Sequence, residues 1–241
     1  MTMLKTNENG RSMIEMLGVL AIIGVLSVGG IAGYSKAMNK FKTNKVADNV
    51  SMLVANIKTM YAQQKTYGSL DTDSANEMGL IPDELVKKID DTTSYKNAYN
   101  GEVEIHTAGS TVAAQAPTTP GGNDGKSADN KAFVIFFGGL SREACITLAT
   151  NDWGSGYSSG LIAMSASGTS AEADKKRVDD VLIGNDGTQQ KPNSTGQTDG
   201  IPYAIATPGG KNLSVPMKVT QAASACSCTT GNTCSITWKY Y

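Results

Sequence analysis

The sequence predicts an α+β fold in which one long N-terminal helix packs against an antiparallel sheet. No proline occurs before Pro82, so helical character can continue from about Arg11 to Gln64. After this helix the chain is rich in Gly, Ser, Thr and Asn, a composition typical of strands and loops rather than of a helical bundle. The 241 residues leave room for one membrane-length segment and one sizeable globular domain.

The first half of the predicted helix is apolar on every side. Residues 16–35 carry no charge, and at about 1.5 Å per residue they extend roughly 30 Å, the thickness of a bilayer's hydrocarbon core. Glu15 stands at the edge of this run. A carboxylate costs about 2.5 to 3.5 kcal/mol at mid-bilayer and less near the edge, so Glu15 is expected to need a partner. Residues 1–10 precede the helix as a short polar leader.

The second half of the helix is apolar on one face only. Its apolar residues recur at three- and four-residue spacings: Val46, Val50, Leu53, Val54, Ile57 and Met60. A helix of more than fifty residues is much longer than a usual globular helix. We therefore expect a domain to be folded onto residues 36–66.

Residues 67–241 are predicted to form that domain. A connector contains a short helix near 82–88, with Pro82 in its first turn. A second short helix is capped by Ser141 and has Glu143 in its first turn. The strongest strand candidates are 102–107, 132–137 and 235–241, and the weaker ones are 160–165, 177–183, 201–206 and 213–219, the last an edge strand because of Pro216. Residues 107–131 and 184–200 have almost no large apolar side chains and read as surface loops.

Four cysteines, Cys145, Cys226, Cys228 and Cys234, all lie beyond the apolar segment. An even number of cysteines fits disulfides formed in an oxidising compartment. The rival is a four-cysteine zinc site, but the spacing lacks the usual C-x2-C knuckle and His106 is the only histidine. We predict disulfides and no metal. Steric reach disfavours Cys226 with Cys228, which leaves Cys145 bonded into the terminal cluster and the other two cysteines closing a short loop.

Other sequence features do not indicate catalysis. The net charge is −1 and the lysines are scattered, so charge does not argue for nucleic-acid binding, and nucleic acid stays open as a partner. His106 lies in an alternating strand without a nearby nucleophile and is interpreted as structural. The two GNDG motifs, at 122–125 and 184–187, lack the acidic spacing of a calcium loop and predict turns. No cofactor and no enzymatic activity are expected.

The N-terminal motif Gly10-Arg11-Ser12-Met13-Ile14-Glu15, followed by the apolar helix, resembles the class III signal of type IV prepilins. Arg11 differs from the hydrophobic first residue of the family pattern. The resemblance implies that a prepilin peptidase cuts between Gly10 and Arg11 and that the new N-terminus at Arg11 is methylated. It also implies that Glu15 pairs with the N-terminal amine of a neighbouring subunit and so sets the assembly register. Arg11, four residues before Glu15, is a local rival partner.

The body of the chain adds to this resemblance. The segment NAYNGEVEI (97–105) is similar to the entry to a strand in many pilin-like proteins, and KAFVIFFGGLSREACITLA (131–149) resembles the strand and helix of type IVb pilins. In that group a cysteine on this helix bonds a C-terminal cysteine and frames the D-region. Here Cys145 and the cluster that ends at Cys234 occupy those places.

The resemblance therefore implies a structural subunit of a type IVb-like pilus, stored in the inner membrane with its head outside the cytoplasm and then polymerised into an extracellular fibre for adhesion, aggregation or conjugation. Its expected partners are other copies of itself, the prepilin peptidase, the pilus assembly machinery, and host or cell surfaces. The implied regions are a leader at 1–10, a transmembrane or filament-core helix half at 11–35, an amphipathic half at 36–66, and a pilin head at 67–241 with a D-region from Cys145 to Cys234. A minor pilin, a type II secretion pseudopilin, and a membrane-anchored periplasmic binding or enzymatic domain are the alternatives.

Two other readings of the N-terminus compete. The segment could be an ordinary signal peptide cut after Ala32, or a generic signal anchor. The positive-inside rule also conflicts with a head outside the cytoplasm, because more basic residues follow the apolar span than precede it. The cysteines and the pilin resemblance favour the head outside.

Overall fold

The computed structural model describes residues 13–109, 130–154, 159–175, 178–179, 182–183, 189–190, 203–206, 211–214, 216–228, 231 and 233–241. The chain divides into two compact units, Met1–Phe41 and Lys42–Tyr241. One helix, α1 (Met13–Tyr61), contributes to both units. The predicted long helix is confirmed, and its C-terminal end lies three residues before the predicted end.

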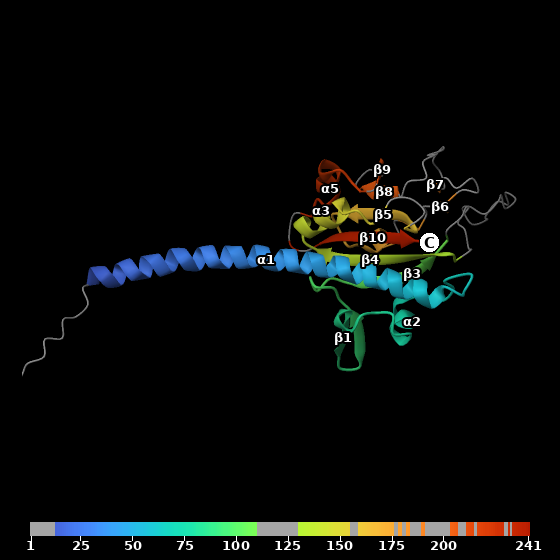
Figure 1. The fold of residues 1–241 in the computed structure, drawn as a ribbon, viewed down its shortest axis with the longest axis horizontal. Coiled ribbons are helices and arrows are strands. Elements are labelled where there is room, and N and C mark those ends of the chain that lie inside the picture. The colour runs from blue at the N-terminus through green and yellow to red at the C-terminus, as the bar shows by residue number, and fades with distance from the viewer. Residues whose placement is uncertain are drawn as a thin grey trace, which may run out of the picture. The chain divides into compact units, whose positions relative to one another are not determined.

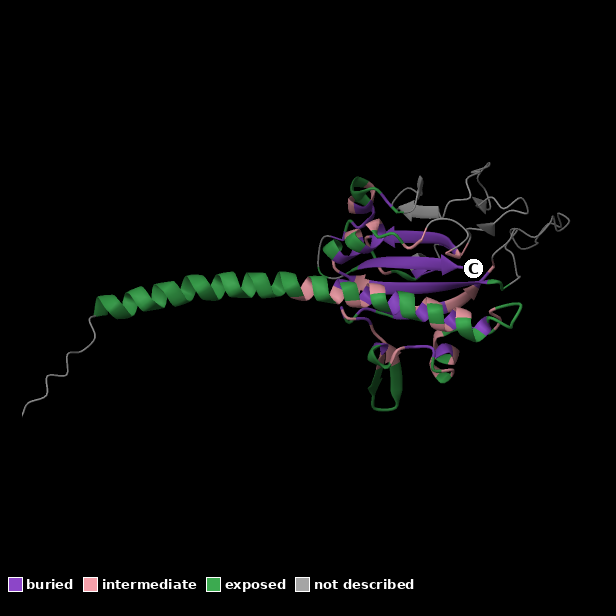
Figure 2. Cartoon of the chain, in the orientation of Figure 1, coloured by how far each residue is buried: buried purple, intermediate pink, exposed green. Residues whose placement is uncertain are grey.

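In the first unit, α1 exposes its apolar side chains. Every described residue from Met13 to Ala37 is exposed, and Leu26, in the middle of the apolar run, is 69% exposed. Figure 2 shows this part of the helix in the colour of exposed residues. Among the described residues, α1 is the one helix that is long and apolar enough to cross a membrane.

In the second unit, α1 buries one face against the domain. The buried residues follow the helical repeat: Thr43, Val46, Asn49, Val50, Leu53, Ile57 and Tyr61. Val54 is half-buried, as expected at the edge of such a face. The prediction was wrong for Met60, which is 48% exposed, because Tyr61 is the residue that continues the buried face.

The connector after α1 is more regular than the sequence predicts. It contains α2 (Thr72–Glu77), a 3-10 turn (Asp83–Leu85) and a hairpin of β1 (Val86–Ile89) and β2 (Thr92–Tyr95). The predicted helix near 82–88 is therefore only one turn, preceded by Pro82 as its N-cap. The hairpin was missed because its turn is built on Asp90, which adopts a positive φ of 52° without a glycine to signal it.

Within the described residues, six strands form the main sheet in the order β3-β4-β10-β5-β8-β9. Their bounds are β3 (Val103–Ala108), β4 (Ala132–Leu140), β10 (Cys234–Tyr240), β5 (Leu161–Ser167), β8 (Tyr203–Ala206) and β9 (Lys211–Ser214). Figure 1 shows β10 between β4 and β5. Neighbouring strands are antiparallel, as predicted, with one exception: β5 and β8 are parallel. A parallel pair needs a long crossover, and here 35 residues separate the end of β5 from the start of β8.

The centre of the sheet is buried on both faces. On one face Ile135 of β4, Trp238 of β10 and Met164 of β5 lie in register and join the main core with α1. On the other face Val134 and Val178 belong to a smaller core. Burial on both sides explains why β4 is a continuous apolar run without alternation.

Two short helices, α3 (Arg142–Thr150) and α5 (Val219–Ala225), contact strands of the main sheet. Helix α3 begins at Ser141, whose hydroxyl accepts a hydrogen bond from the amide of Ala144, so the predicted capped helix is confirmed. Helix α5 falls at the end of the predicted strand 213–219. That prediction was correct only for its beginning, in β9, and wrong for its end, because the chain enters a helix after Pro216.

The remaining weak candidates have mixed outcomes. The candidates 160–165 and 201–206 are confirmed by β5, which continues to Ser167, and by β8. The candidate strand 177–183 follows helix α4 (Glu172–Lys175), and residues 177, 180 and 181 lie outside the described residues. The prediction was wrong for the turn at 178–179 and correct for β6 (Leu182–Ile183), which pairs with β7 (Gln189–Gln190). Most of the two predicted surface loops, and the two GNDG motifs, lie outside the described residues.

Candidate assembly surface and disulfide-framed head

Glu15 lies in the first turn of α1, where the helix dipole favours an acidic side chain. Its neighbours along the exposed apolar stretch include Met13, Ile14 and Leu17, which are 60 to 81% exposed. Among the described residues, no hydrogen bond or ion pair engages the Glu15 carboxylate. The predicted cleavage residues Gly10 and Arg11 lie outside the described part of the chain, so the structure does not place them near Glu15. The surface around Glu15 is thus an apolar rod with one acid near its start.

Polar contacts attach the second half of α1 to the connector. The hydroxyls of Thr43 and Tyr99 are 2.8 Å apart in a buried hydrogen bond, and the side-chain amide of Asn56 donates to the carbonyl oxygen of Leu80 at 2.9 Å. Lys45 forms an ion pair with Glu84. Thr43 and Lys45 share one turn of the helix and Asn56 lies on a turn further along, so the connector fixes both the rotation and the axial position of the docked half of α1 on the domain.

Lys58, near the C-terminal end of α1, makes a further contact. Its Nζ donates to the carbonyl oxygen of Ser159 at 3.0 Å and lies 5.4 Å from the centre of the Tyr240 ring. Burial lowers the pKa of Lys58. A Cβ at Gly160 would displace this flexible ammonium, and the φ of +74° at this position favours glycine.

The segment NAYNGEVEI forms a tight entry to β3. The Asn97 side chain accepts hydrogen bonds from the amides of Tyr99 and Gly101 and donates to the carbonyl oxygen of Gly138 at 2.8 Å. Asn100 has a positive φ of 62°, which asparagine tolerates better than most residues. A Cβ on Gly101 would collide with the Gly138 backbone. The pattern of two asparagines and a glycine is therefore explained by the turn that it forms.

The hairpin of the connector is attached to α2 through one hydrogen bond. The Tyr95 hydroxyl donates to Asp73 at 2.8 Å. Burial, together with the hydrogen bond and the negative charge of Asp73, raises the pKa of Tyr95 to about 12. The hydroxyl therefore remains protonated, and able to donate, over the whole physiological range.

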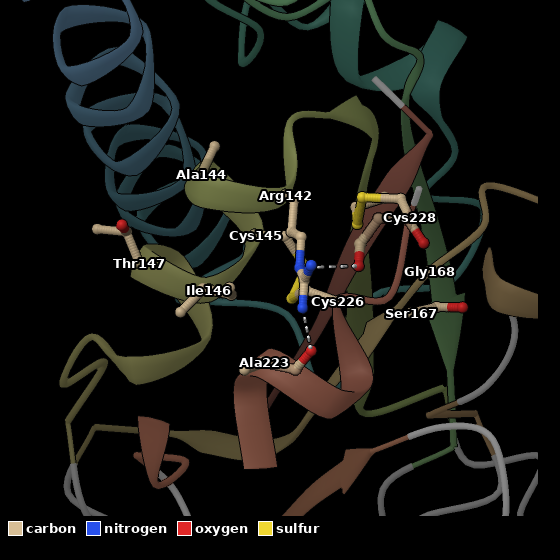
Figure 3. The surroundings of a disulfide bond; sticks show 12 residues. Arg142, Ala144, Cys145, Ile146, Thr147, Ser167, Gly168, Ala223, Cys226 and Cys228 are labelled. Atoms are coloured by element: carbon tan, nitrogen blue, oxygen red, sulfur yellow. Dashed lines mark hydrogen bonds between the residues drawn. A yellow bond between two sulfur atoms is a disulfide. The ribbon is translucent and has the colours of Figure 1, made fainter. Parts of the chain in front are cut away.

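Two disulfides frame the C-terminal part of the head. Cys145 on α3 bonds Cys226 at the C-cap of α5, and Cys228 bonds Cys234 at the start of β10. This is one of the two connectivities that the sequence leaves open. Figure 3 shows the Arg142 side chain reaching across from α3, and its guanidinium donates to the carbonyl oxygen of Ala223 at 3.4 Å. All four sulfurs are engaged in bonds, so no thiolate remains for the rival zinc site.

A charged cluster covers the outer face of the sheet, opposite α1. Lys175 of α4 lies 2.7 Å from Glu104 on β3, 3.1 Å from Glu102 just before β3, and 3.2 Å from Glu172 of its own helix. Burial lowers the pKa of Lys175, but the hydrogen bonds to these glutamates outweigh it and the pKa is raised. Lys175 has no recognisable sequence signal, because two of its three partners, Glu102 and Glu104, belong to a distant part of the chain.

His106 belongs to the same outer face. Its Nε2 lies 2.9 Å from an oxygen of Asp179, and the ammonium of buried Lys239 donates to the carbonyl oxygen of Asp179 at 2.9 Å. These contacts attach the segment that follows α4 to strands β3 and β10. They give His106 a packing role in the head. The alternation of β10, in which Lys239 separates two buried aromatic residues, was the sequence signal for a lysine on this face.

Comparison with known proteins gives one family match. The Bundlin family model matches residues 35–184, which run from α1 through the connector, β3, β4 and α3 beyond β5. The major structural subunit of bundle-forming pilus from Escherichia coli O127:H6 is 26% identical over 152 residues, covering 62% of this chain and 68% of that protein. The toxin coregulated pilin of Vibrio cholerae is 29% identical over 153 residues, covering 61% and 59%.

Two solved structures are also similar. TcpA, a type IV pilin from the Vibrio cholerae El Tor biotype, matches with a TM-score of 0.43 and 18% identity, covering 83% of this chain and 99% of that one. A type IVb pilin from Salmonella typhi matches with a TM-score of 0.40 and 13% identity, covering 80% and 95%.

Proposed function

This chain belongs to the Bundlin family of pilins, and from that premise we propose how it is processed, anchored and assembled. Pilins are structural subunits that polymerise into extracellular pili, so the chain is a structural protein and not an enzyme, as the sequence resemblance implied. We propose that it is the major subunit of a type IVb-like pilus that serves adhesion, aggregation or conjugation.

The observation that carries the proposal is the exposed first half of α1. More than twenty consecutive residues, most of them apolar, are exposed to solvent, while the same helix continues into the buried core of the head. An apolar surface of this length is not left in water by a soluble monomer. A bilayer covers it in the precursor, and the helices of neighbouring subunits cover it in the fibre.

Processing follows from the motif at the N-terminus. A prepilin peptidase cuts between Gly10 and Arg11, and the α-amine of Arg11 is methylated. Cleavage removes the polar leader 1–10 and places a new amine four residues before Glu15. The cut therefore creates the cationic partner for a carboxylate that has none among the described residues.

The inner membrane holds the precursor through a single pass, with the head outside the cytoplasm. The two disulfides support this orientation, because such bonds persist in oxidising compartments and are rare in the cytosol. The orientation opposes the positive-inside rule, which is a bias and is weaker for long translocated domains. The assembly machinery then transfers the helix from bilayer to fibre.

In the fibre, Glu15 sets the register between subunits. Its carboxylate pairs with the N-terminal amine of a neighbouring copy, because an unpaired carboxylate is costly in an apolar helix bundle. Arg11, four residues earlier in the chain, is the rival partner within one subunit. The head faces outward, where it meets host or cell surfaces, and nucleic acid stays open as a further partner.

Electron microscopy of surface-sheared material tests the proposal. Cells that express this chain with a prepilin peptidase and assembly machinery are expected to release filaments in which this chain is the main component. Filaments that contain it only in trace amounts would instead indicate a minor pilin. A chain that stays in the membrane fraction without filaments would contradict the proposal and favour a membrane-anchored domain or a pseudopilin.

A further inference from the structure

The two disulfides of the head lie next to each other. The Sγ atoms of Cys145, Cys226 and Cys234 are all within 4.8 Å of one another, although Cys234 belongs to the other bond. The Cys145 sulfur also lies 4.0 Å from the carbonyl oxygen of Ser235, the residue after Cys234. The Cys228 sulfur is not a member of this group of three. The sulfur of Cys234 therefore lies within 4.8 Å of both sulfurs of the long-range disulfide, whereas the sulfur of Cys228 does not lie within this distance of both.

We propose that Cys234 is an internal nucleophile that exchanges the disulfides of the head. When the Cys228–Cys234 bond opens, the Cys234 thiolate attacks a sulfur of the Cys145–Cys226 bond. A new bond forms to Cys145 or Cys226, the Cys145–Cys226 bond breaks, and the displaced sulfur leaves as a thiolate that takes up a proton. The proton that Cys234 lost balances the one that the leaving sulfur gains, so this step needs no oxidant or reductant.

A small thiol such as glutathione starts the exchange. Its thiolate attacks Cys228, forms a mixed disulfide there and releases Cys234 as the leaving thiolate. Cys228 is the entry point because it is the least buried of the four cysteines, at 6% exposed against 0% for the others. The guanidinium of Arg142, three residues before Cys145 on α3, adds a positive charge that favours thiolates nearby.

The exchange changes the element to which Cys145 of α3 is bonded. Cys226 caps α5, whereas Cys234 begins the central strand β10. A Cys145–Cys234 bond ties α3 directly to β10 and releases the end of α5, while Cys145 still anchors the long loop. Helix α5 is then no longer bonded to α3, while a disulfide from Cys145 still closes the long loop between α3 and the C-terminal cysteines. This inference does not rest on the proposed pilus function.

The test uses the full chain in detergent with Cys228→Ser. This variant leaves Cys234 as a free thiol beside the intact Cys145–Cys226 bond. Incubation without added thiol, acid quenching, alkylation and peptide mapping without reduction are expected to reveal peptides that link Cys234 to Cys145 or Cys226. Between about pH 6.5 and about pH 7.5 the exchange rate is expected to rise about tenfold, because the thiolate fraction of a cysteine with a pKa near 8.5 does so.

Cys234→Ser is the matched control. It opens the same disulfide but leaves Cys228 as the free thiol, outside the group of three sulfurs. This variant is expected to keep the Cys145–Cys226 bond alone, with Cys228 alkylated. The proposal is overturned if Cys228→Ser gives the same map, with Cys234 alkylated and no peptide that links it to another cysteine, or if both variants exchange equally.

A second measurement covers the case in which Cys228→Ser fails to fold, as judged by circular dichroism. The unsubstituted chain is titrated with glutathione until half of the Cys228–Cys234 bond is open. Peptides that link Cys234 to Cys145 or Cys226 support the proposal. A mixture of native pairs and free Cys234 thiol, with no such peptides, contradicts it.

Discussion

At the scale of single residues, Glu15 is a carboxylate whose charge has no ion-pair partner among the described residues. It lies on a helix whose surroundings are apolar. Insertion tolerates such a group at the membrane edge, but assembly of many copies into an apolar core multiplies the cost. A partner that exists only between subunits resolves this, because the charge is then paired in the fibre.

Glu15→Ala is expected to leave membrane insertion intact and to reduce fibre yield at least about tenfold, because a charge-assisted hydrogen bond of about 1.5 to 3 kcal/mol is lost at each subunit contact. Glu8→Ala, in the proposed leader, is the matched control and is expected to change neither quantity. Membrane fractionation and quantification of sheared fibres measure the two effects. A normal fibre yield from Glu15→Ala would show that the carboxylate does not set the register.

Lys175 is a second residue on which the structure depends. It is almost fully buried and contacts three glutamates: Glu104 on β3, Glu102 just before β3, and Glu172 within its own helix. Without Lys175, negative charges would face each other over the outer side of the sheet. The contribution is smaller than that of a fully buried pair because the glutamates remain accessible to water.

Lys175→Met is therefore expected to lower the free energy of unfolding of the head by about 1 to 2 kcal/mol. The exposed Lys88→Met serves as the control, with an expected change below about 0.5 kcal/mol. Because folding raises the pKa of Lys175, its stabilisation is fully present below the ordinary value of 10.5 and is lost as the pH rises through the higher folded value. Denaturant titration at several pH values from about 7 to about 10 measures this, because lysine and glutamate are both charged over most of this range. Equal stability losses in the two variants at neutral pH would contradict the assignment.

At the scale of elements, α1 is one helix in two environments. Its second half is held by a buried face and its first half has no cover in the monomer. Leu53 and Met52 are neighbours in sequence, yet Leu53 is fully buried and Met52 is 48% exposed. They provide a direct test of which face docks on the head.

Leu53→Ala is expected to destabilise the head by about 2 to 5 kcal/mol, the range for removing a buried leucine side chain. Met52→Ala is expected to cost less than about 0.5 kcal/mol, because Met52 does not pack in the core of the head. Thermal unfolding of the full chain in detergent compares them. Equal losses in the two variants would mean that the helix docks in another rotation.

The two disulfides are expected to contribute unequally to the free energy of unfolding of the head. The Cys145–Cys226 bond joins residues 81 apart and the Cys228–Cys234 bond joins residues 6 apart. Since a bond that closes a longer loop restricts the unfolded chain more, removing the first pair with Cys145→Ser and Cys226→Ser is expected to cost about 4.5 kcal/mol and removing the second pair about 2 kcal/mol. Unfolding midpoints of the two double variants decide the order, and a larger loss from the short-loop pair would contradict it.

The sequence predicts those elements whose signal is local. The long helix follows from the absence of proline, and β3, β4 and β10 follow from their apolar patterns. The hairpin β1–β2 was missed because an aspartate, not a glycine, takes the positive φ in its turn. The parallel pairing of β5 with β8 and the partner of Cys145 depend on contacts between distant segments, which no local pattern encodes.

The residues of the candidate site also differ in whether the local sequence indicates them. Glu15 is visible in the sequence because it interrupts an apolar run, and the cysteines are visible because they are few. Lys175 and Asp179 were missed because each is an ordinary surface residue in its local sequence. Only the fold brings Lys175 to Glu104 and Asp179 to His106, on the outer face of the sheet.

At the scale of the whole molecule, the chain combines an apolar rod with a disulfide-tied head. The rod is suited to a bilayer and to a helical core, both of which exclude water. The head has its own core and needs neither environment to bury its apolar residues. This separation allows one subunit to exist first as a membrane protein and then as part of a fibre.

The central claim is that removal of the leader converts the membrane-anchored chain into a fibre subunit. Intact-mass measurement of subunits from surface-sheared filaments tests it most directly. The account predicts a chain that begins at Arg11, lighter than the full 25.2 kDa chain by residues 1–10 and heavier by about 14 Da for one methyl group. Filament subunits that retain residues 1–10, or that begin beyond Ala32, would contradict it.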